Sequence, residues 1–183
     1  MNVYDMDGLE ESVHWYAARV RPQTEDKIKD YLEAINIEHF IPFKTITVEY
    51  KGKKRKEEKP LIPRIIFVRT TYSKAFSLPH ESGYRISYIR NLGAKEIQII
   101  PDKQMEDCRF IFNLSDKLFN ICGANVQLGD KVRVIRGPFT GIEGELVCIK
   151  GHKRVIVRLE GIFSLAIHYI PDEYLEKIED PQL

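Results

Sequence analysis

From residue 129 onward the chain alternates short apolar runs with turn-forming residues, and few folds accept such a pattern. The runs are rich in β-branched residues and lie at residues 131–136, 144–149, 154–159 and 163–167. Glycine or proline separates the runs, as expected for short strands joined by tight turns. Short strands at such regular spacing are typical of a small closed sheet. The pattern therefore predicts a small β-barrel over residues 127–180.

The first hundred residues mix strand and helix patterns. We expect strands at residues 14–20, 39–48, 61–70, 84–90 and 96–100. Apolar residues at helical spacing predict a helix that Thr24 caps, a shorter one that Pro79 ends, and a third that Pro101 begins. We therefore predict an α+β domain, with helices packed on an antiparallel sheet, over residues 12–113, and a short linker over residues 114–126.

Charge is unevenly distributed along a chain whose formal net charge is only +1. Six lysines and arginines crowd residues 51–59, opposed by Glu57 and Glu58 alone. The near-neutral total argues against a protein that coats nucleic acid by bulk electrostatics, but a local patch still attracts phosphate. We interpret the stretch as the basic tip of a long hairpin between two strands.

The sequence carries no pattern typical of an enzyme or a metal site. Its five histidines have no metal-ligand spacing, and no phosphate-binding glycine loop or nucleophile elbow is present. Cys108, Cys122 and Cys148 form no C-x-x-C pair, so we expect buried thiols rather than ligands. We therefore predict no catalytic residues, no metal and no cofactor.

The sequence also lacks the features of an exported or membrane protein. No apolar run approaches the ~18–20 residues that span a bilayer. Residues 1–11 are acidic and have neither a basic patch nor an apolar segment of the secretory type. We expect a cytoplasmic monomer with no membrane partner.

The segment over residues 130–146 has the residues that a strand, a tight turn and a second strand require. Gly137 and Pro138 shape the turn, Phe139 packs against it, and Gly144 permits a close backbone approach where a side chain would clash. The segment resembles the KOW motif of ribosomal and transcription-elongation proteins.

The first domain resembles the amino-terminal domain of the NusG family. The resemblance rests on His14-Trp15-Tyr16, on Ile41-Pro42, on the basic hairpin and on the strand at residues 61–68. Arg64 stands where that family commonly has glycine, and Ile65 where it commonly has an aromatic residue. Segments at residues 15–21, 101–105, 151–155 and 159–166 further resemble UpxY-type antiterminators of capsular polysaccharide operons in Bacteroides-like bacteria.

The resemblance implies a surface that binds RNA polymerase, through the clamp helices of its large catalytic subunit. The matching residues are Tyr16, Ile62, Pro63, Ile65 and Phe67. Because alternate residues of a strand share a face, we expect Ile65 and Phe67 to lie on an exposed face, with Ile66 and Val68 inside. A strand whose two faces both belong to the core is the alternative.

The resemblance also implies contacts with nucleic acid and with a second protein. Arg19, Arg21 and Lys27 lie where RfaH-like relatives read the non-template DNA strand, and the hairpin residues Lys53, Lys54 and Arg55 are candidates for DNA or nascent RNA. Surface arginines and a solvated hairpin are the alternatives. Phe139 and Phe163 are candidates for binding ribosomal protein S10, or for packing alone.

The function implied is suppression of pausing and termination by RNA polymerase, in a capsular or exopolysaccharide operon. A housekeeping NusG that also serves the termination factor Rho is the first alternative. A KOW-type RNA-binding or ribosome-associated protein is the second, and it predicts a basic barrel. Residues 126–180 instead contain eight lysines and arginines against nine acids, which weakens that alternative.

Overall fold

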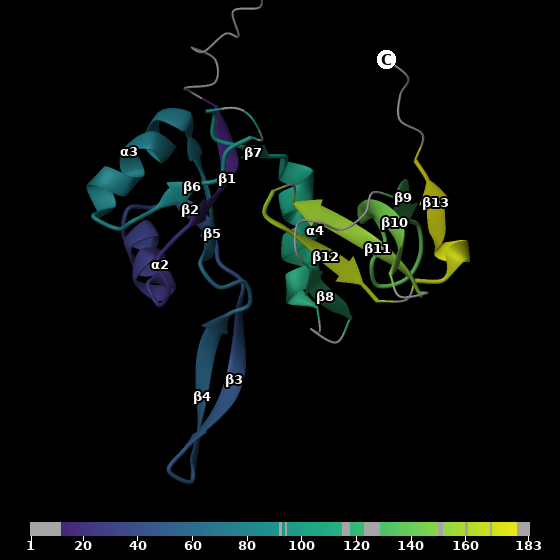
Figure 1. Ribbon diagram of the computed structural model, residues 1–183, viewed down its shortest axis with the longest axis horizontal. Helices are drawn as coiled ribbons and strands as arrows, with labels where there is room; N and C mark the ends of the chain where they lie inside the picture. Colours follow the sequence, from purple (N-terminus) through teal and green to yellow (C-terminus); the bar gives the residue numbers. More distant parts are fainter. Residues whose placement is uncertain are drawn as a thin grey trace, which may run out of the picture. The chain divides into compact units, whose positions relative to one another are not determined.

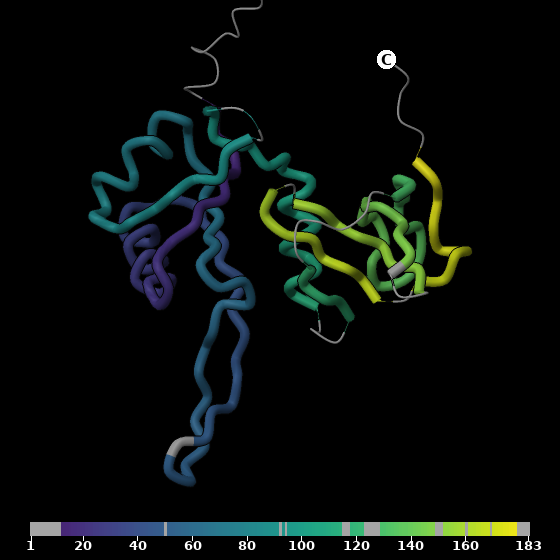
Figure 2. The backbone as a smooth tube through the Cα atoms, viewed as in Figure 1, coloured from purple at the N-terminus to yellow at the C-terminus, as the bar shows by residue number. Residues whose placement is uncertain are grey.

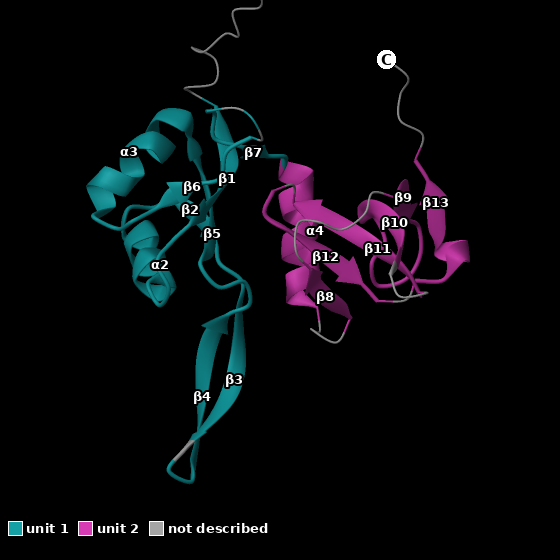
Figure 3. Ribbon diagram, viewed as in Figure 1, with its two compact units in different colours: residues 1–101 teal, residues 102–183 magenta. Residues whose placement is uncertain are grey.

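A computed structural model describes residues 12–91, 93, 95–114, 118–122, 129–149, 152–159, 161–168 and 170–178. The chain forms two compact units, residues 1–101 and residues 102–183 (Figure 3). Unit 1 is a mixed α+β unit and unit 2 is rich in strands, so the predicted α+β fold class is confirmed. Among the described residues, no helix has the length and hydrophobicity to cross a bilayer.

Unit 1 is built on an antiparallel sheet with the order β2-β5-β1-β6 (Figure 1). Its strands are β1 (Val13–Arg19), β2 (Glu38–Phe40), β5 (Ile65–Thr71) and β6 (Ser87–Tyr88), and β7 (Ile99–Ile100) pairs with β1. The predicted strands at 84–90 and 96–100 thus shrink to two residues each. The strand expected at 39–48 is broken at Pro42, whose carbonyl accepts a hydrogen bond from Leu61 N at 2.7 Å.

Two helices of unit 1, α2 (Glu25–Ala34) and α3 (Tyr72–Ser82), cover one face of this sheet. Ile28 and Leu32 of α2 and Leu78 of α3 pack against Ala18 and Ile66, which are cross-strand partners. Two details differ from expectation. The Thr24 hydroxyl donates to Arg21 O at 2.7 Å instead of capping α2. Helix α3 continues past Pro79 and ends at a glycine in the left-handed conformation.

The strands β3 (Phe43–Tyr50) and β4 (Lys53–Pro60) form a separate two-stranded sheet. This hairpin extends away from the rest of unit 1 (Figure 2). The basic stretch is not the tip of the hairpin, as we expected, but its whole second strand. The turn is Lys51-Gly52, with φ of 51° and 74°, and two residues with positive φ are typical of a tight type I′ hairpin turn.

Unit 2 contains one antiparallel sheet with the order β13-β9-β10-β11-β12-β8. Its strands are β8 (Phe119–Cys122), β9 (Asp130–Val134), β10 (Glu143–Ile149), β11 (His152–Leu159), β12 (Phe163–Ile167) and β13 (Leu175–Lys177), with a 3-10 turn at Asp172–Tyr174. The four central strands are those predicted, and the outer strands β8 and β13 were not. The predicted clash at Gly144 is confirmed, because a Cβ there would lie 2.6 Å from Ile156 O.

Helix α4 (Asp102–Asn113) groups with unit 2, whereas the sequence placed it at the end of the first domain. The Phe112 ring lies 5.7 Å from that of Phe119 and 6.0 Å from that of Phe163. The apolar face of α4 thus packs against strands of the second unit. Most of the expected linker, residues 115–117 and 123–126, lies outside the described residues.

The three cysteines differ in burial, although we expected all of them to be buried. Cys108 of α4 is buried, Cys122 is half-buried and Cys148 is exposed. Burial raises the pKa of the Cys108 thiol, so this group stays protonated and acts as a small apolar side chain. Cys148 lies on β10 of a sheet with one solvated face, where alternate residues point outward.

A bidentate ion pair ties β10 to β11 inside unit 2. Arg158 Nε and Nη2 donate to the two oxygens of Glu145 at 2.9 and 3.0 Å, and the side chains are only 15% and 17% exposed. The guanidinium is the main reason why the pKa of Glu145 lies below its ordinary value of 4.5, while burial opposes this shift and the Gly129 N–H assists it. The ionised carboxylate is therefore favoured by the fold.

We expect Glu145→Gln to lower the free energy of unfolding at neutral pH by about 2 kcal/mol, because Arg158 loses its charged partner. A lowered folded-state pKa stabilises the fold above pH 4.5, and that stabilisation disappears as the pH falls through the folded value. The variant should therefore lose less stability than wild type upon acidification. Urea unfolding at several pH values measures both effects. Asp172→Asn, in a pair 57% and 66% exposed, is the control and should change little.

Candidate functional site

The expected docking strand lies in the middle of the unit 1 sheet, and the face expected to be exposed is buried. Ile65 and Phe67 are 8% and 0% exposed, Ile66 and Val68 are fully buried, and β5 is thus covered on both faces. The Phe67 ring lies 6.2 Å from the Phe40 ring of the neighbouring strand β2. A role of this strand in binding a partner stays a prediction.

The remaining candidates of the docking set differ in exposure. Tyr16 is 0% and Ile62 is 8% exposed, while Pro63 is exposed. The Tyr16 ring packs edge-to-face on Tyr88 with centroids 6.1 Å apart, and burial, with a smaller effect of Tyr72, raises the pKa of its hydroxyl. Pro63 is therefore the one member of the set that the structure leaves at the surface.

Pro63 owes its position to a tight turn before β5. Arg64 has φ of 67°, a left-handed conformation that glycine adopts more readily than any other residue. Arg64 N donates to Glu25 Oε1 at 2.9 Å, and Arg64 O accepts from Val20 N at 2.9 Å. The buried carboxylate of Glu25, at the start of α2, thus fixes the turn and keeps Pro63 and Arg64 at the surface.

A pocket of about 320 Å³ lies beside this turn. It is lined by Arg19, Val20, Arg21, Pro22, Arg64, Arg85 and Ser87. The sequence had grouped Arg19 and Arg21 as nucleic-acid-binding candidates, and the structure joins them to Arg64 and Arg85. Lys27, the third member of that group, does not line the pocket. The sequence drew attention to Arg64 only because it stands where glycine is common. Nothing in the sequence drew attention to Arg85.

The register of the hairpin divides its charges between two faces. Directly paired residues share a face, and residues one step apart lie on opposite faces. The basic face has four cations and one acid: Lys44, Lys53, Arg55, Lys59 and Glu57. The neutral face has two cations and two acids: Glu49, Lys54, Lys56 and Glu58. The expected hairpin set of Lys53, Lys54 and Arg55 is therefore divided, with Lys54 on the neutral face.

The two aromatic candidates of unit 2 are both in its core. Phe139 is 5% and Phe163 is 3% exposed, and Phe163 contacts Phe112 of α4. Packing accounts for both residues, and a role in binding a partner stays a prediction. Large apolar side chains that do reach the surface of this unit include Ile121 and Ile135, at 39% and 42% exposure.

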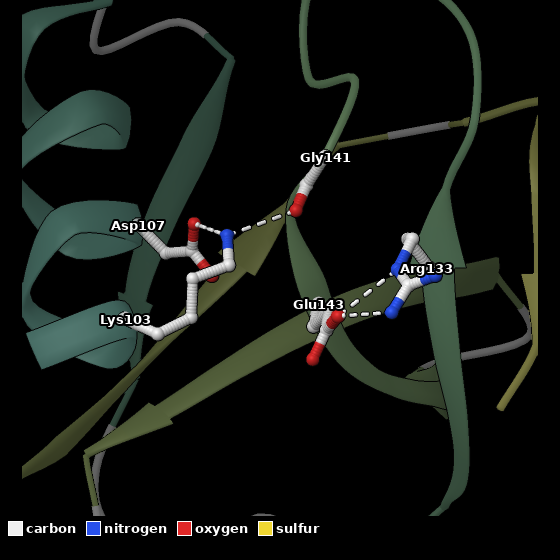
Figure 4. A network of polar contacts seen from close by, with 5 residues as sticks. All are labelled: Lys103, Asp107, Arg133, Gly141 and Glu143. Carbon is white, nitrogen blue, oxygen red and sulfur yellow. Dashed lines mark hydrogen bonds and ion pairs between the residues drawn. The ribbon is translucent and has the colours of Figure 1, made fainter. Parts of the chain in front are cut away.

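A polar network joins α4 to the turn before β10 (Figure 4). Lys103 Nζ lies 2.6 Å from Asp107 Oδ1 and donates to Gly141 O at 3.0 Å, while Arg133 pairs with Glu143 at 2.7 Å. Burial raises the pKa of Asp107, and the Lys103 hydrogen bond opposes this shift. The described residues contain no group of three or more histidines, cysteines or acids that could hold a metal.

Comparison with protein families matches residues 13–109, more than half of the 183 residues, to the family described as transcription termination factor NusG. No curated protein matches the chain. A solved structure described as domain interaction in Thermotoga maritima NusG is similar, with 20% sequence identity and a TM-score of 0.47. That alignment covers 92% of this chain and 98% of the Thermotoga chain.

Proposed function

The chain belongs to the NusG family of transcription factors, and from this premise we propose that it is an antitermination factor. Members of this family bind RNA polymerase and have no catalytic activity. In this proposal the protein acts in the cytoplasm, docks on the clamp helices of the large catalytic subunit, and suppresses pausing and termination. We assign it to the UpxY-type group that serves capsular or exopolysaccharide operons, on the strength of the matching segments at residues 15–21, 101–105, 151–155 and 159–166.

One arrangement in unit 1 supports this proposal above others. The turn that presents Pro63 lies beside the pocket lined by Arg19, Arg21, Arg64 and Arg85. An apolar contact for a protein and a set of cations for a nucleic acid are thus available at one end of one sheet. A factor that binds a transcription complex needs both, since polymerase and nucleic acid lie side by side there.

The proposed mechanism is a shift in the equilibrium between polymerase states. A ligand shifts such an equilibrium only by binding one state more tightly than the other. A protein that contacts both sides of the polymerase cleft makes all its contacts only when the clamp is closed, which disfavours the paused state. Unit 2, held at high effective concentration, is then available to bind S10.

Purified RNA polymerase tests the proposal in a single set of reactions. We expect the protein to increase transcription through a terminator and to be recovered with the polymerase. Pro63→Asp should reduce that recovery about tenfold, which corresponds to ~1.4 kcal/mol, because the change places a charge in an apolar contact. Pro63 is exposed, so the variant keeps the core of unit 1 intact.

Phe76→Asp supplies the matched control, since this residue of α3 is an apolar side chain 65% exposed and does not line the pocket beside the turn. It should bind polymerase as wild type does. Equal recovery of polymerase by Pro63→Asp and wild type would remove the docking assignment. Increased termination in the presence of Rho would instead favour the housekeeping alternative.

A further inference from the structure

Glu25, the first residue of α2, is a carboxylate buried inside unit 1. It is only 4% exposed, and glutamate is almost never buried to this degree without a partner. The other buried acid among the described residues, Asp107, is paired with Lys103. Within the same part of the chain Glu25 has no cationic partner, and its carboxylate accepts its hydrogen bond from the backbone N–H of Arg64 at 2.9 Å. The buried charge therefore acts on the turn before β5.

The turn before β5 has the features of a type II β-turn over residues 62–65. Ile65 N donates to Ile62 O at 3.4 Å, so Pro63 and Arg64 are the two central residues. Proline fixes a negative φ at the first central position, and the φ of 67° at Arg64 is the positive value that a type II turn requires at the second. Glycine is the usual residue there, because the left-handed conformation disfavours an L-residue by a factor of about ten.

A type I turn is the competing conformation for the same residues. It accepts proline at the first central position and most residues at the second, where φ is negative. The two turns differ by a flip of the peptide between Pro63 and Arg64, which reverses the direction of the Arg64 N–H. The type II turn directs this N–H at the Glu25 carboxylate, and the type I turn directs it away. Because a charge-assisted hydrogen bond is strong enough to offset the strain at Arg64, the carboxylate selects the type II turn.

We propose that Glu25 is a positioning residue for the docking of RNA polymerase and that it acts by setting the type of this turn. The inference rests on the proposed function, in which Pro63 contacts the polymerase. The peptide flip reorients the carbonyl of Pro63 and the side chain of Arg64, so a type I turn presents a different surface. When only one conformation is competent to bind, the apparent affinity falls in proportion to the fraction of molecules that have it.

Glu25→Leu removes the acceptor and places an apolar side chain of similar size in a buried position, a change that folded proteins tolerate. Recovery of purified RNA polymerase, without nucleic acid, should fall about tenfold, because roughly one molecule in ten keeps the type II turn. Glu25→Gln keeps an acceptor oxygen and should retain most of the binding. Asp26→Leu, at an exposed acid in the same first turn of α2, has the same change of charge and should bind as wild type.

A second-site variant separates the turn from the helix. Glycine favours the type II turn without help from a carboxylate, so Glu25→Leu/Arg64→Gly should recover as much polymerase as Arg64→Gly alone. If Glu25 served only the stability of α2, Arg64→Gly would not restore binding, because this residue lies outside that helix. Restored binding therefore assigns the effect of Glu25 to the turn.

Nuclear magnetic resonance of the full-length protein reports the turn type without any polymerase. In the type II turn the Hα of Pro63 lies close to the amide proton of the next residue, and in the type I turn the two protons are further apart. The nuclear Overhauser effect between them should be strong in wild type and weak in Glu25→Leu. It should be strong again in Glu25→Leu/Arg64→Gly.

A loss of polymerase recovery in Glu25→Leu that Arg64→Gly does not restore would overturn the proposal, and so would equal recovery by Glu25→Leu and wild type. The proposed function is judged separately, by the dependence of recovery on Pro63. A protein that shows the expected change of turn but does not bind polymerase disproves the proposed function alone. A protein whose polymerase binding depends on Pro63 but not on Glu25 disproves the positioning role alone.

Discussion

Gly144→Ala is expected to destabilise unit 2 by about 3 kcal/mol, the upper end of the range for an overpacked core, and Gly144→Val by more. A Cβ at this position would lie 2.6 Å from Ile156 O and 2.9 Å from Val155 Cγ1. Ile156 cannot move away easily, because its strand β11 is paired on both sides, with β10 and with β12. A loss of this size is a large part of the stability of a small domain.

Hydrogen exchange measures this effect for each unit separately. Protection should fall across β9, β10 and β11 while the amides of β1 and β5 keep theirs. Gly141→Ala is the control, since this glycine has φ of 90° but nothing within 4 Å of an added Cβ. Gly141→Ala introduces backbone strain without a steric clash, so it should lower the stability of unit 2 by less than Gly144→Ala does. Equal losses from the two substitutions would show that conformation, rather than space, makes Gly144 necessary.

The hairpin should bind duplex nucleic acid through its basic face only. Lys53→Gln/Arg55→Gln removes two cations from this face, and Lys54→Gln/Lys56→Gln removes two from the neutral face of the same strand. The two double variants have equal net charge, and all four residues are exposed. If phosphates lie against the basic face, the first pair lowers the slope of log K against log salt by about 1.8, or 0.9 for each contact.

Fluorescence anisotropy with a labelled DNA duplex, repeated over a series of salt concentrations, gives these slopes. The Lys54→Gln/Lys56→Gln variant should keep the slope of wild type, because Glu49 and Glu58 already neutralise its face. Two variants with the same reduced slope would mean that only total charge matters. Loss of polymerase binding by the first variant, with duplex binding intact, would assign the basic face to an acidic protein surface instead.

The sequence predicts the central strands of unit 2 well because their pattern is local. Runs of β-branched residues between glycines and prolines admit one interpretation, and β9 to β12 follow it. The outer strands escape prediction since they are short: β8 has four residues, and β13 has three, two of them charged. Their conformation comes from the neighbouring strand rather than from their own composition.

Strand β4 shows the same limit in unit 1. Its sequence, Lys53–Pro60, consists almost entirely of lysine, arginine and glutamate, which propensity alone assigns to a loop. Pairing with β3 along its whole length overrides that propensity. The sequence therefore predicted the hairpin and its charge, but not the register that divides this charge between two faces.

The candidate site depended on contacts that no local pattern contains. Arg64 and Arg85 join Arg19 and Arg21 only because the ends of β1, β5 and β6 meet at one end of the sheet. In the same way, an apolar strand such as β5 gives no sign of which of its faces is covered. Burial of Ile65 and Phe67 depends on what packs against each face of the sheet, which the strand alone does not encode.

The hairpin formed by β3 and β4 has a defined length as well as a charge pattern. Its strands have eight residues each, and at ~3.4 Å per residue they place the turn roughly 27 Å from their base. Because side chains alternate with a period of two, removing two residues from each strand would shorten this arm by about 7 Å and keep the same cations facing the same way. Removing a single residue from each would turn the remaining cations to the opposite side. The length of this hairpin can therefore change only by two residues per strand at a time if the cations are to stay on the same face.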